Sequence, residues 1–430
     1  MGELLQNDIY LIPRASGTGK LIYSPLRKML FAASDAAAEA IKIYVMDGTP
    51  LPAGYGRIGD YMHTMMERQA VLPMERNVGS RNHVVILLSH RCNLACSYCY
   101  AQEARSSETM ERSVLNTVID NLFRGVDGNL MFTFMGGGEP TLTWDLLSYG
   151  IERIRSWTYD QSKVRVGITT NGTLLNRNRI AWLKAHNADV GISFEILPDI
   201  QDRQRGFQGG GRSSHVAVDE VIGLLAEAEI YPRLRATITP DNLHRMTEMV
   251  EYANRHYPHL KKLHFEHATQ EGLSTEDYYA PFVDEFFNAK RTATGYGIEL
   301  RNSVITSVYS LRSRFCKGEY CITPSGSIVS CHRVASADDP LFEKFYYGQA
   351  TASDVELDKG KRAEIQALAE AKPAECEECF ARWHCAGICT ENKFYFEKDS
   401  LDRLCEFARD MIRRELEERA GEPVFTNHAM

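Results

Sequence analysis

Three cysteines, Cys92, Cys96 and Cys99, constrain this chain more than any other feature of its sequence. They come directly after the apolar run 84–88, which predicts a buried strand whose C-terminal end leads into the cysteine loop. One such loop can aim three thiolates at a common point, which suits a soft metal centre. Three protein ligands would leave one iron of a [4Fe-4S] cluster open to a further ligand. The alternatives are a reduced cysteine cluster or part of a zinc knuckle, although thiolate zinc sites normally supply four protein ligands.

The other cysteines are grouped as well. Of the eleven in the chain, three lie at 92–99, three at 316–331 and five at 376–405. No export signal precedes them, so a disulfide framework is not expected, and the grouping is typical of metal sites. Zinc bound by the two pairs between 376 and 389 is a competing interpretation of the last group. That interpretation leaves four cysteines without a role, namely Cys316, Cys321, Cys331 and Cys405.

Composition excludes several classes of function. The 430 residues are 44% hydrophobic and 25% charged, which is ordinary for a globular protein of two or three domains. The net charge of −8, without a basic patch, argues against a nucleic-acid partner. No run reaches the roughly 18 apolar residues of a membrane span, and residues 1–8 do not form a signal peptide. A cytoplasmic protein without a membrane partner is therefore expected.

From residue 82 apolar strands alternate with helices, which predicts an α/β fold with a partial (β/α)6 TIM-like barrel. The expected strands are 84–89, 130–135, 164–169, 189–194, 234–238 and 262–265. The expected helices are 109–126, 144–157, 176–186, 214–229, 242–257 and 275–292. Six such units favour parallel strands joined by right-handed crossovers. In barrels of this kind the functional residues gather at the C-terminal ends of the strands.

Segments on both sides of the barrel have a different pattern. Before it, residues 8–13 and 20–23 are expected to pair as strands, and residues 26–45 to form a helix. This small α+β segment would either cap the barrel or bind a peptide, and capping is favoured. After it, a hairpin at 320–330, a helix at 355–371 and a charged surface helix at 406–419 are expected. The predicted domains are 1–80, 81–300, 301–410 and a tail at 411–430.

Polar and glycine-rich segments follow three of the predicted strands. They are 136–141 after the second strand, 169–174 after the third, and 193–195 at the end of the fourth. Glycines there let a ligand approach the backbone, and Glu139 offers a carboxylate to an ammonium group. Three such turns beside a three-cysteine loop indicate a binding site rather than ordinary connections.

At Cys92, Cys96 and Cys99, followed by Tyr100, the chain resembles the radical S-adenosylmethionine (SAM) superfamily. The segment Gly137-Gly138-Glu139-Pro140 is similar to the GGEP motif of that family, whose carboxylate and backbone hold the SAM ammonium group. The resemblance implies further SAM contacts by Tyr98, Asn171, Ser193 and Arg205. The usual Ser-x-Asp-Gly is replaced by Ser-Phe-Glu-Ile at 193–196, which keeps an acid but lacks the glycine.

The C-terminal cysteines resemble the SPASM extension of peptide- and protein-modifying members of this superfamily. Their intervals match its C-x9–15-G-x4-C and C-x2-C-x5-C-x3-C signature. The resemblance implies one auxiliary [4Fe-4S] cluster held by Cys316, Cys321, Cys331 and Cys389. It implies a second held by Cys376, Cys379, Cys385 and Cys405. With the three cysteines of the first loop, these two sets use all eleven.

The function implied by this resemblance is a radical SAM maturase. A 5′-deoxyadenosyl radical would remove hydrogen from a ribosomally made precursor peptide, and a side-chain cross-link is the favoured product. A flavodoxin- or ferredoxin-type protein would supply electrons. The alternatives are an anaerobic sulfatase-maturing enzyme, which forms formylglycine, and a non-catalytic iron–sulfur electron carrier. Sulfatase-maturing enzymes have an aspartate where this chain has His332; His332, Glu266 and His267 are candidate bases by position.

Overall fold

A computed structural model describes residues 2–73, 81–126, 128–269 and 276–421 of the chain. These residues belong to two compact units. The first comprises Met1–Glu75, Asn302–Cys316 and Ala369–Met430, and the second comprises Arg76–Arg301 and Lys317–Leu368. Within the described ranges, every helix is too short or too polar to cross a membrane.

The second unit is built on an eleven-stranded sheet of order β11-β10-β9-β8-β7-β6-β5-β12-β13-β14-β15. Neighbouring strands are parallel from β11 to β12, and the last three pairings are antiparallel. The parallel strands are β5 (His83–Ile86), β6 (Leu130–Phe134), β7 (Val164–Thr170), β8 (Ala188–Ser193), β9 (Arg233–Ile238), β10 (Lys262–His267), β11 (Glu299–Arg301) and β12 (Tyr320–Ile322). The others are β13 (Ser327–Val329), β14 (Tyr346–Ala350) and β15 (Val355–Leu357).

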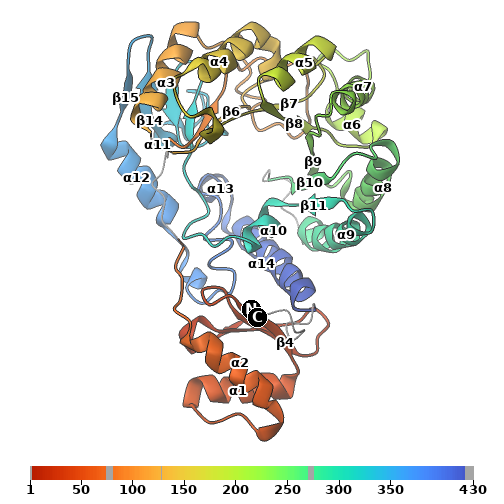
Figure 1. The fold of residues 1–430 in the computed structure, drawn as a ribbon, viewed down its shortest axis with the longest axis vertical. Helices are drawn as coiled ribbons and strands as arrows, with labels where there is room; N and C mark the ends of the chain where they lie inside the picture. The colour runs from red at the N-terminus through yellow and green to blue at the C-terminus, as the bar shows by residue number, and fades with distance from the viewer. Residues whose placement is uncertain (1, 74–80, 127, 270–275, 422–430) are drawn as a thin grey trace. The chain divides into compact units, whose positions relative to one another are not determined.

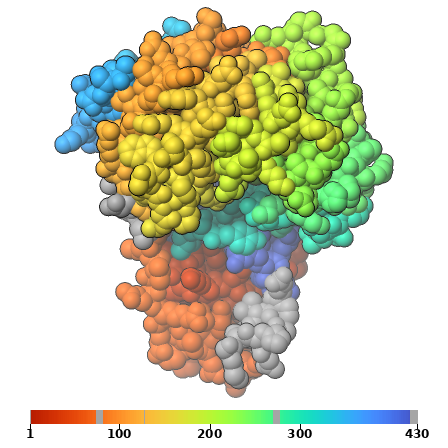
Figure 2. All heavy atoms as spheres, turned by 45° about the horizontal axis from the view of Figure 1, so that its top comes forward, coloured from red at the N-terminus to blue at the C-terminus, as the bar shows by residue number. Residues whose placement is uncertain are grey.

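Helices cover the outer face of the parallel strands, as Figure 1 shows. Each is amphipathic and turns its apolar stripe toward the sheet; α3, for example, buries Leu115, Val118 and Leu122. On the face shown in Figure 2, residues between about 130 and 230 form a continuous outer layer, coloured yellow to green. The helices are α3 (Arg112–Gly125), α4 (Trp144–Ser156), α5 (Arg177–Ala185), α6 (Pro198–Gln204), α7 (Ser214–Glu227), α8 (Met246–His256), α9 (Glu276–Gly295), α11 (Phe342–Phe345) and α12 (Lys359–Glu370).

The six predicted strands and six predicted helices of the barrel are all present, so the partial-barrel prediction is confirmed. The start of the helix expected at 275–292 lies outside the described residues, and α9 continues to Gly295. The short helix α6 was not expected. The helix expected at 355–371 is wrong in its first turn, because Val355–Leu357 pairs with β14 as a strand and α12 begins at Lys359.

The predicted hairpin at 320–330 is confirmed as β12 and β13. Its turn is closed by the Gly326 N–H, which donates to the Thr323 carbonyl at 2.9 Å. Gly326 has φ +82°, and an added Cβ would lie 2.2 Å from the Ala350 carbonyl oxygen. Only glycine satisfies both conditions. Because β12 pairs in parallel with β5, this hairpin extends the barrel sheet directly beside the strand that precedes the cysteine loop.

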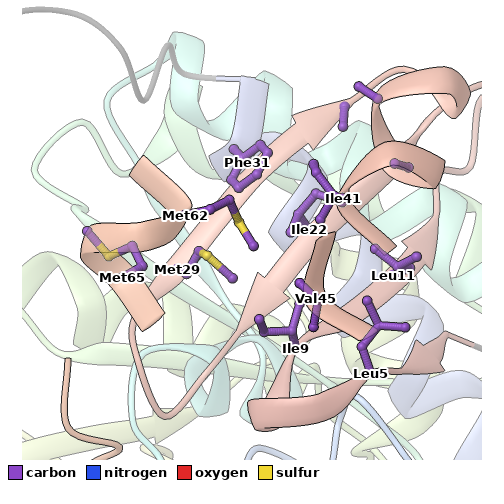
Figure 3. Close-up of a cluster of buried hydrophobic side chains, with 13 residues drawn as sticks. Leu5, Ile9, Leu11, Ile22, Met29, Phe31, Ile41, Val45, Met62 and Met65 are labelled. Atoms are coloured by element: carbon purple, nitrogen blue, oxygen red, sulfur yellow. The ribbon is translucent and has the colours of Figure 1, made fainter. Parts of the chain in front are cut away.

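The first unit contains a four-stranded antiparallel sheet, β1 (Glu3–Leu4), β2 (Tyr10–Pro13), β3 (Lys20–Ser24) and β4 (Met29–Ala33). One face packs on α1 (Asp35–Asp47) and α2 (Gly56–Glu67). Alternate residues of a strand face opposite sides, so Leu11, Ile22 and Phe31 all meet these helices (Figure 3). The strand pairing predicted for 8–13 with 20–23 is therefore confirmed.

The helix predicted at 26–45 is wrong over its first half. Residues Met29–Ala33 form β4, and Lys28 has φ +57°, which ends any helix there. The helix α1 begins after Ser34, whose side chain accepts a hydrogen bond from the Ala37 N–H. The apolar residues of this stretch fit the period of a helix and the period of a strand. Residues Met29–Ala33 form a strand because they pair with β3.

The opposite face of this sheet is covered by the C-terminal helix. Tyr10, Leu21 and Tyr23 pack with Ile412 and Leu416 of α14 (Lys398–Gly421). The helix predicted at 406–419 is therefore present, but its expected place on the surface is wrong: one stripe of α14 completes a buried core. The remaining helices of this unit are α10 (Ser303–Val308) and α13 (Asn392–Tyr395).

A substitution in α14 tests this core. Leu416 is fully buried, so Leu416→Ala should lower the free energy of unfolding of the first unit by about 2–5 kcal/mol. The matched control is Asp402→Ala on the exposed side of α14, which removes only an ion pair with Lys398 and should cost about 0.5 kcal/mol or less. Urea unfolding followed by circular dichroism measures both. Equal effects of the two changes would contradict the assigned packing.

Candidate iron–sulfur and SAM site

The three-cysteine loop follows β5, and its backbone is fastened to segment 204–208. The N–H groups of Ala95 and Ser97 donate to carbonyls of that segment at 2.8 and 2.9 Å, and the Asn93 carbonyl accepts from Gln208 at 3.0 Å. Leu94 and Phe207 form a buried cluster against which all three cysteines pack, namely Cys92, Cys96 and Cys99. The loop therefore holds its three thiols against one buried cluster.

Burial raises the pKa of the Cys92 and Cys96 thiols, and the neighbouring thiols raise it further. Iron binds the thiolate form of cysteine, so ligation at Cys92 and Cys96 must overcome this effect of burial. Within the described residues, no three His, Cys, Asp or Glu side chains converge as they would around a single metal ion. Ligands of a multi-iron cluster bind different irons and stand further apart. The loop offers three thiols, one fewer than a thiolate zinc site normally has, and three thiols can ligate three irons of a [4Fe-4S] cluster.

Arg105 contacts this loop although nothing in the sequence singled it out. Its guanidinium donates to the Leu94 carbonyl at 3.0 Å and to Cys99 Sγ at 3.4 Å. A positive donor at this position stabilises thiolate charge. Because Arg105 lies six residues beyond Cys99 in an irregular segment, no sequence period could have revealed the contact.

The GGEP segment lies against the root of the cysteine loop. The Gly138 N–H donates to the Ser89 carbonyl at 2.9 Å, and the Glu139 N–H donates to the Arg91 carbonyl at 2.7 Å. A Cβ on Gly138 would stand 1.9 Å from that same Arg91 oxygen, so no other residue fits here. Gly137, at φ +63°, makes the preceding turn, and the buried Pro140 begins the next short helix. All four residues of the motif therefore have a backbone role.

The Glu139 carboxylate is buried and accepts four hydrogen bonds. Oε1 receives them from the N–H and hydroxyl of Thr141 and from the Thr170 hydroxyl, and Oε2 receives one from the Asn171 N–H at 2.7 Å. The side chain predicted to hold an ammonium group thus also joins the ends of β6 and β7. Asn171 extends the connection, because its amide donates to the Asn93 side chain at 2.9 Å.

Tyr98, Glu195 and Arg205 meet at the end of β8. The Tyr98 hydroxyl donates to the Glu195 carboxylate, and Arg205 donates to the Tyr98 hydroxyl at 2.6 Å. Glu195 is fully buried, and burial raises its pKa to about 7 although the Arg205 guanidinium, 3.7 Å away, lowers it. The acid that replaces the usual aspartate therefore has a defined place. Ser193 ends β8 in register with Arg235 of β9.

The three candidate bases lie in different surroundings. His267 packs edge-on against Tyr279 and Phe282 of α9, so its ring faces the helical layer. Glu266 is the neighbouring residue of β10 and pairs with the Nε2 of His264 at 2.5 Å. Burial opposes this charge, yet the two histidines beside it and Arg235 hold the pKa of Glu266 well below its usual range. Sequence reasoning missed His264.

His332 lies close to the cysteine loop. Its Nδ1 is 2.9 Å from the Glu319 carboxylate, which also accepts the His332 N–H. Its ring meets Tyr100, the residue after Cys99, edge-on at 5.6 Å between centroids. Burial raises the pKa of Glu319, but the imidazole outweighs it and lowers the pKa overall. Of the three candidates, His332 is thus the one in contact with the loop that carries the cysteines.

The remaining cysteines divide between the units, and all eleven cysteines of the described chain are thiols rather than disulfides. In the first unit, burial raises the pKa of Cys405 to about 12, with further contributions from Cys385, Cys376 and Cys379. These four are the second predicted set. Of the other set, Cys321 and Cys331 share a buried cluster in the second unit, while Cys316 and Cys389 lie near Lys393 in the first.

Comparison with known proteins agrees with this geometry. Residues 86–253 match the family model described as Radical SAM superfamily. A cysteine-type anaerobic sulfatase-maturating enzyme of Clostridium novyi is 32% identical over 124 residues, which are 27% of this chain and 33% of that protein. The PqqA peptide cyclase of Rhodopseudomonas palustris is 28% identical over 265 residues, which are 58% of this chain and 66% of that protein.

Among solved structures, native anSMEcpe with bound AdoMet has a TM-score of 0.65 at 19% identity. The match covers 79% of this chain and 100% of the anSMEcpe chain. At this identity the likeness concerns the fold, and it extends beyond the residues that the family model matches. The three-cysteine loop, the GGEP segment and the partial barrel lie within or beside the matched residues, and residues 86–253 form a radical SAM domain.

Proposed function

We propose that this chain is a radical SAM maturase that removes hydrogen from a precursor peptide and forms an oxidised product, a side-chain cross-link. The observation that carries the proposal is the arrangement at the carboxyl edge of one parallel sheet. There, three thiols of one loop lie beside the GGEP segment and the Tyr98–Glu195–Arg205 group. Glycine backbone, a carboxylate and a guanidinium together suit a zwitterionic amino acid such as the methionine part of SAM.

Cys92, Cys96 and Cys99 would hold the SAM-binding [4Fe-4S] cluster. When bound, the reduced cluster and SAM supply a 5′-deoxyadenosyl radical. The protein holds the loop rigid from two sides, through the GGEP backbone and through segment 204–208.

The choice of substrate rests on the relatives and on one residue. The matched relatives include a peptide cyclase and a sulfatase-maturating enzyme, so a peptide or protein substrate is common to both. His332, paired with Glu319 beside Tyr100, stands where the sulfatase-maturing pattern expects an aspartate. An imidazole oriented by a carboxylate can accept a proton as the substrate radical is oxidised. This substitution supports the peptide maturase over the sulfatase reading.

The experiment that tests the function is co-expression with short precursor peptides encoded beside the gene, followed by mass spectrometry of the peptide. Loss of two hydrogens is the expected result, because a cross-link oxidises the substrate. Conversion of a Cys or Ser in a sulfatase-derived peptide to formylglycine, with the precursors unchanged, would favour the sulfatase-maturing alternative. If anaerobic incubation with SAM and dithionite yields no 5′-deoxyadenosine, the enzyme proposal fails and the remaining alternative is a non-catalytic electron carrier.

The cluster assignment predicts the iron content. Three [4Fe-4S] clusters correspond to about twelve irons per reconstituted chain. Replacing Cys92, Cys96 and Cys99 together by Ala should leave about eight irons and abolish 5′-deoxyadenosine formation. Replacing Cys379 by Ala should cost up to one auxiliary cluster and leave dithionite-driven SAM cleavage intact. About four irons with bound zinc in the unmodified chain would contradict the auxiliary assignment.

Arg105 is expected to tune the cluster. Its hydrogen bond to Cys99 and its positive charge favour the more negative, reduced state. Arg105→Leu should therefore shift the reduction potential of the SAM-binding cluster to a more negative value. Arg105→Lys, which keeps the charge but loses the fork geometry, should cause a smaller shift. Redox titration followed by electron paramagnetic resonance measures both, and a positive shift in the Leu variant would refute the assigned contact.

A further inference from the structure

A hollow of about 800 Å³ lies beside the cysteine loop. It is lined by Cys92 itself and by residues on both sides of it, including Arg91, Arg105 and Arg212. None of the inner-face barrel residues Ser193, His264 or Glu266 lines it. The hollow is therefore formed by the cysteine loop and the segments beside it, and not by these residues of β8 and β10.

The charge of this hollow is opposite to that of the chain as a whole. The chain carries a net charge of −8, yet three arginines line the hollow and none of its described lining residues is acidic. Glu108 does not line the hollow, but its carboxylate is 3.5 Å from the ring of His90, which does. A concave surface of one sign concentrates its field and attracts partners of the opposite sign. The hollow thus favours an acidic partner.

The three arginines are held at different depths. Arg105 is half-buried and bonds to Cys99 Sγ, as described above. Arg212 is exposed and stacks over the Phe207 ring at 3.9 Å, which holds its guanidinium at the surface. Arg91 is exposed and directly precedes Cys92. Cationic groups therefore extend from the surface to an expected ligand of the cluster.

One wall of the hollow has no side chains. Gly210 and Gly211 line the hollow and are exposed, with φ values of +71° and +91°. A Cβ added to either of them would meet nothing within 4 Å, so internal packing does not require glycine at these positions. A bare backbone wall lets a partner surface approach closely. Close approach matters here because Cys92, which would bind iron, is part of the lining.

We propose that this hollow is the docking site of an acidic one-electron carrier protein that reduces the cluster held by Cys92, Cys96 and Cys99. The proposal rests on the proposed function, which requires that an electron enter from outside. One electron leaves the reduced carrier and enters the cluster, and the carrier departs oxidised by one electron. Arg91 and Arg212 attract and orient the carrier, while the glycine wall admits its redox centre to the shortest path through the loop.

The test compares two reductants on the same full-length, reconstituted enzyme. Reduced flavodoxin, an acidic protein, and dithionite, a small reductant, each drive cleavage of SAM to 5′-deoxyadenosine. In the double variant Arg91→Glu and Arg212→Glu, the flavodoxin-driven rate at low salt should fall about tenfold or more, since steering of this kind changes association rates by that order. The dithionite-driven rate and the iron content should not change. Added salt should narrow the difference between variant and wild type.

The control variant is Arg255→Glu, an exposed charge reversal on α8 outside the hollow. It should leave both rates unchanged. Three results would overturn the proposal: equal loss in the control, no loss in the double variant, or equal loss with both reductants. Absence of 5′-deoxyadenosine from the wild type with dithionite would instead refute the proposed function, and the docking proposal would fall with it.

Discussion

The buried carboxylate of Glu139 holds together the strand ends on which the rest of the site depends. It accepts four hydrogen bonds, from Thr141, Thr170 and Asn171, and so joins the ends of β6 and β7. A buried charge would be costly without such partners, and each hydrogen bond to it contributes about 1.5–3 kcal/mol. Its own N–H bonds to the Arg91 carbonyl, which places the cysteine loop against the same junction. The hydrogen bonds that stabilise the buried Glu139 carboxylate therefore also help to position the thiols of the cysteine loop.

A second attachment makes the loop rigid. Three backbone hydrogen bonds tie it to segment 204–208, and the Tyr98–Glu195–Arg205 group locks that segment to the end of β8. Burial raises the pKa of Glu195, and its contacts with Arg205 and Tyr98 lower that pKa, so they offset part of the cost of its burial. The loop is thus supported by two separate acids on neighbouring parts of the sheet. Preorganisation of this kind is what a site for a reactive intermediate requires.

Much of this fold follows from local pattern, and the exceptions have physical causes. The barrel strands are short apolar runs bounded by turns, so their periodicity identifies them. The segment Met29–Ala33 is also a short apolar run, but its residues fit a helix as well, and its pairing with β3 makes it a strand. For the site, cysteine spacing predicted that one loop carries three thiols, and these thiols pack on one buried cluster. Arg105 and the Glu195 contacts depend on residues far apart in the chain or in irregular segments, where neither period nor spacing carries information.

The two sides of the cysteine loop have separate chemical characters, and this separation has a consequence for turnover. The hollow side is cationic and open. Elsewhere there are two carboxylate–imidazole pairs: Glu266 with His264 on the inner face of the sheet, and Glu319 with His332 near Tyr100. Since no residue of these pairs lines the hollow, a carrier protein and a peptide would not compete for the same surface. Electron entry and substrate binding can then occur together. An enzyme so arranged can receive its electron after the substrate is in place, which limits unproductive cleavage of SAM.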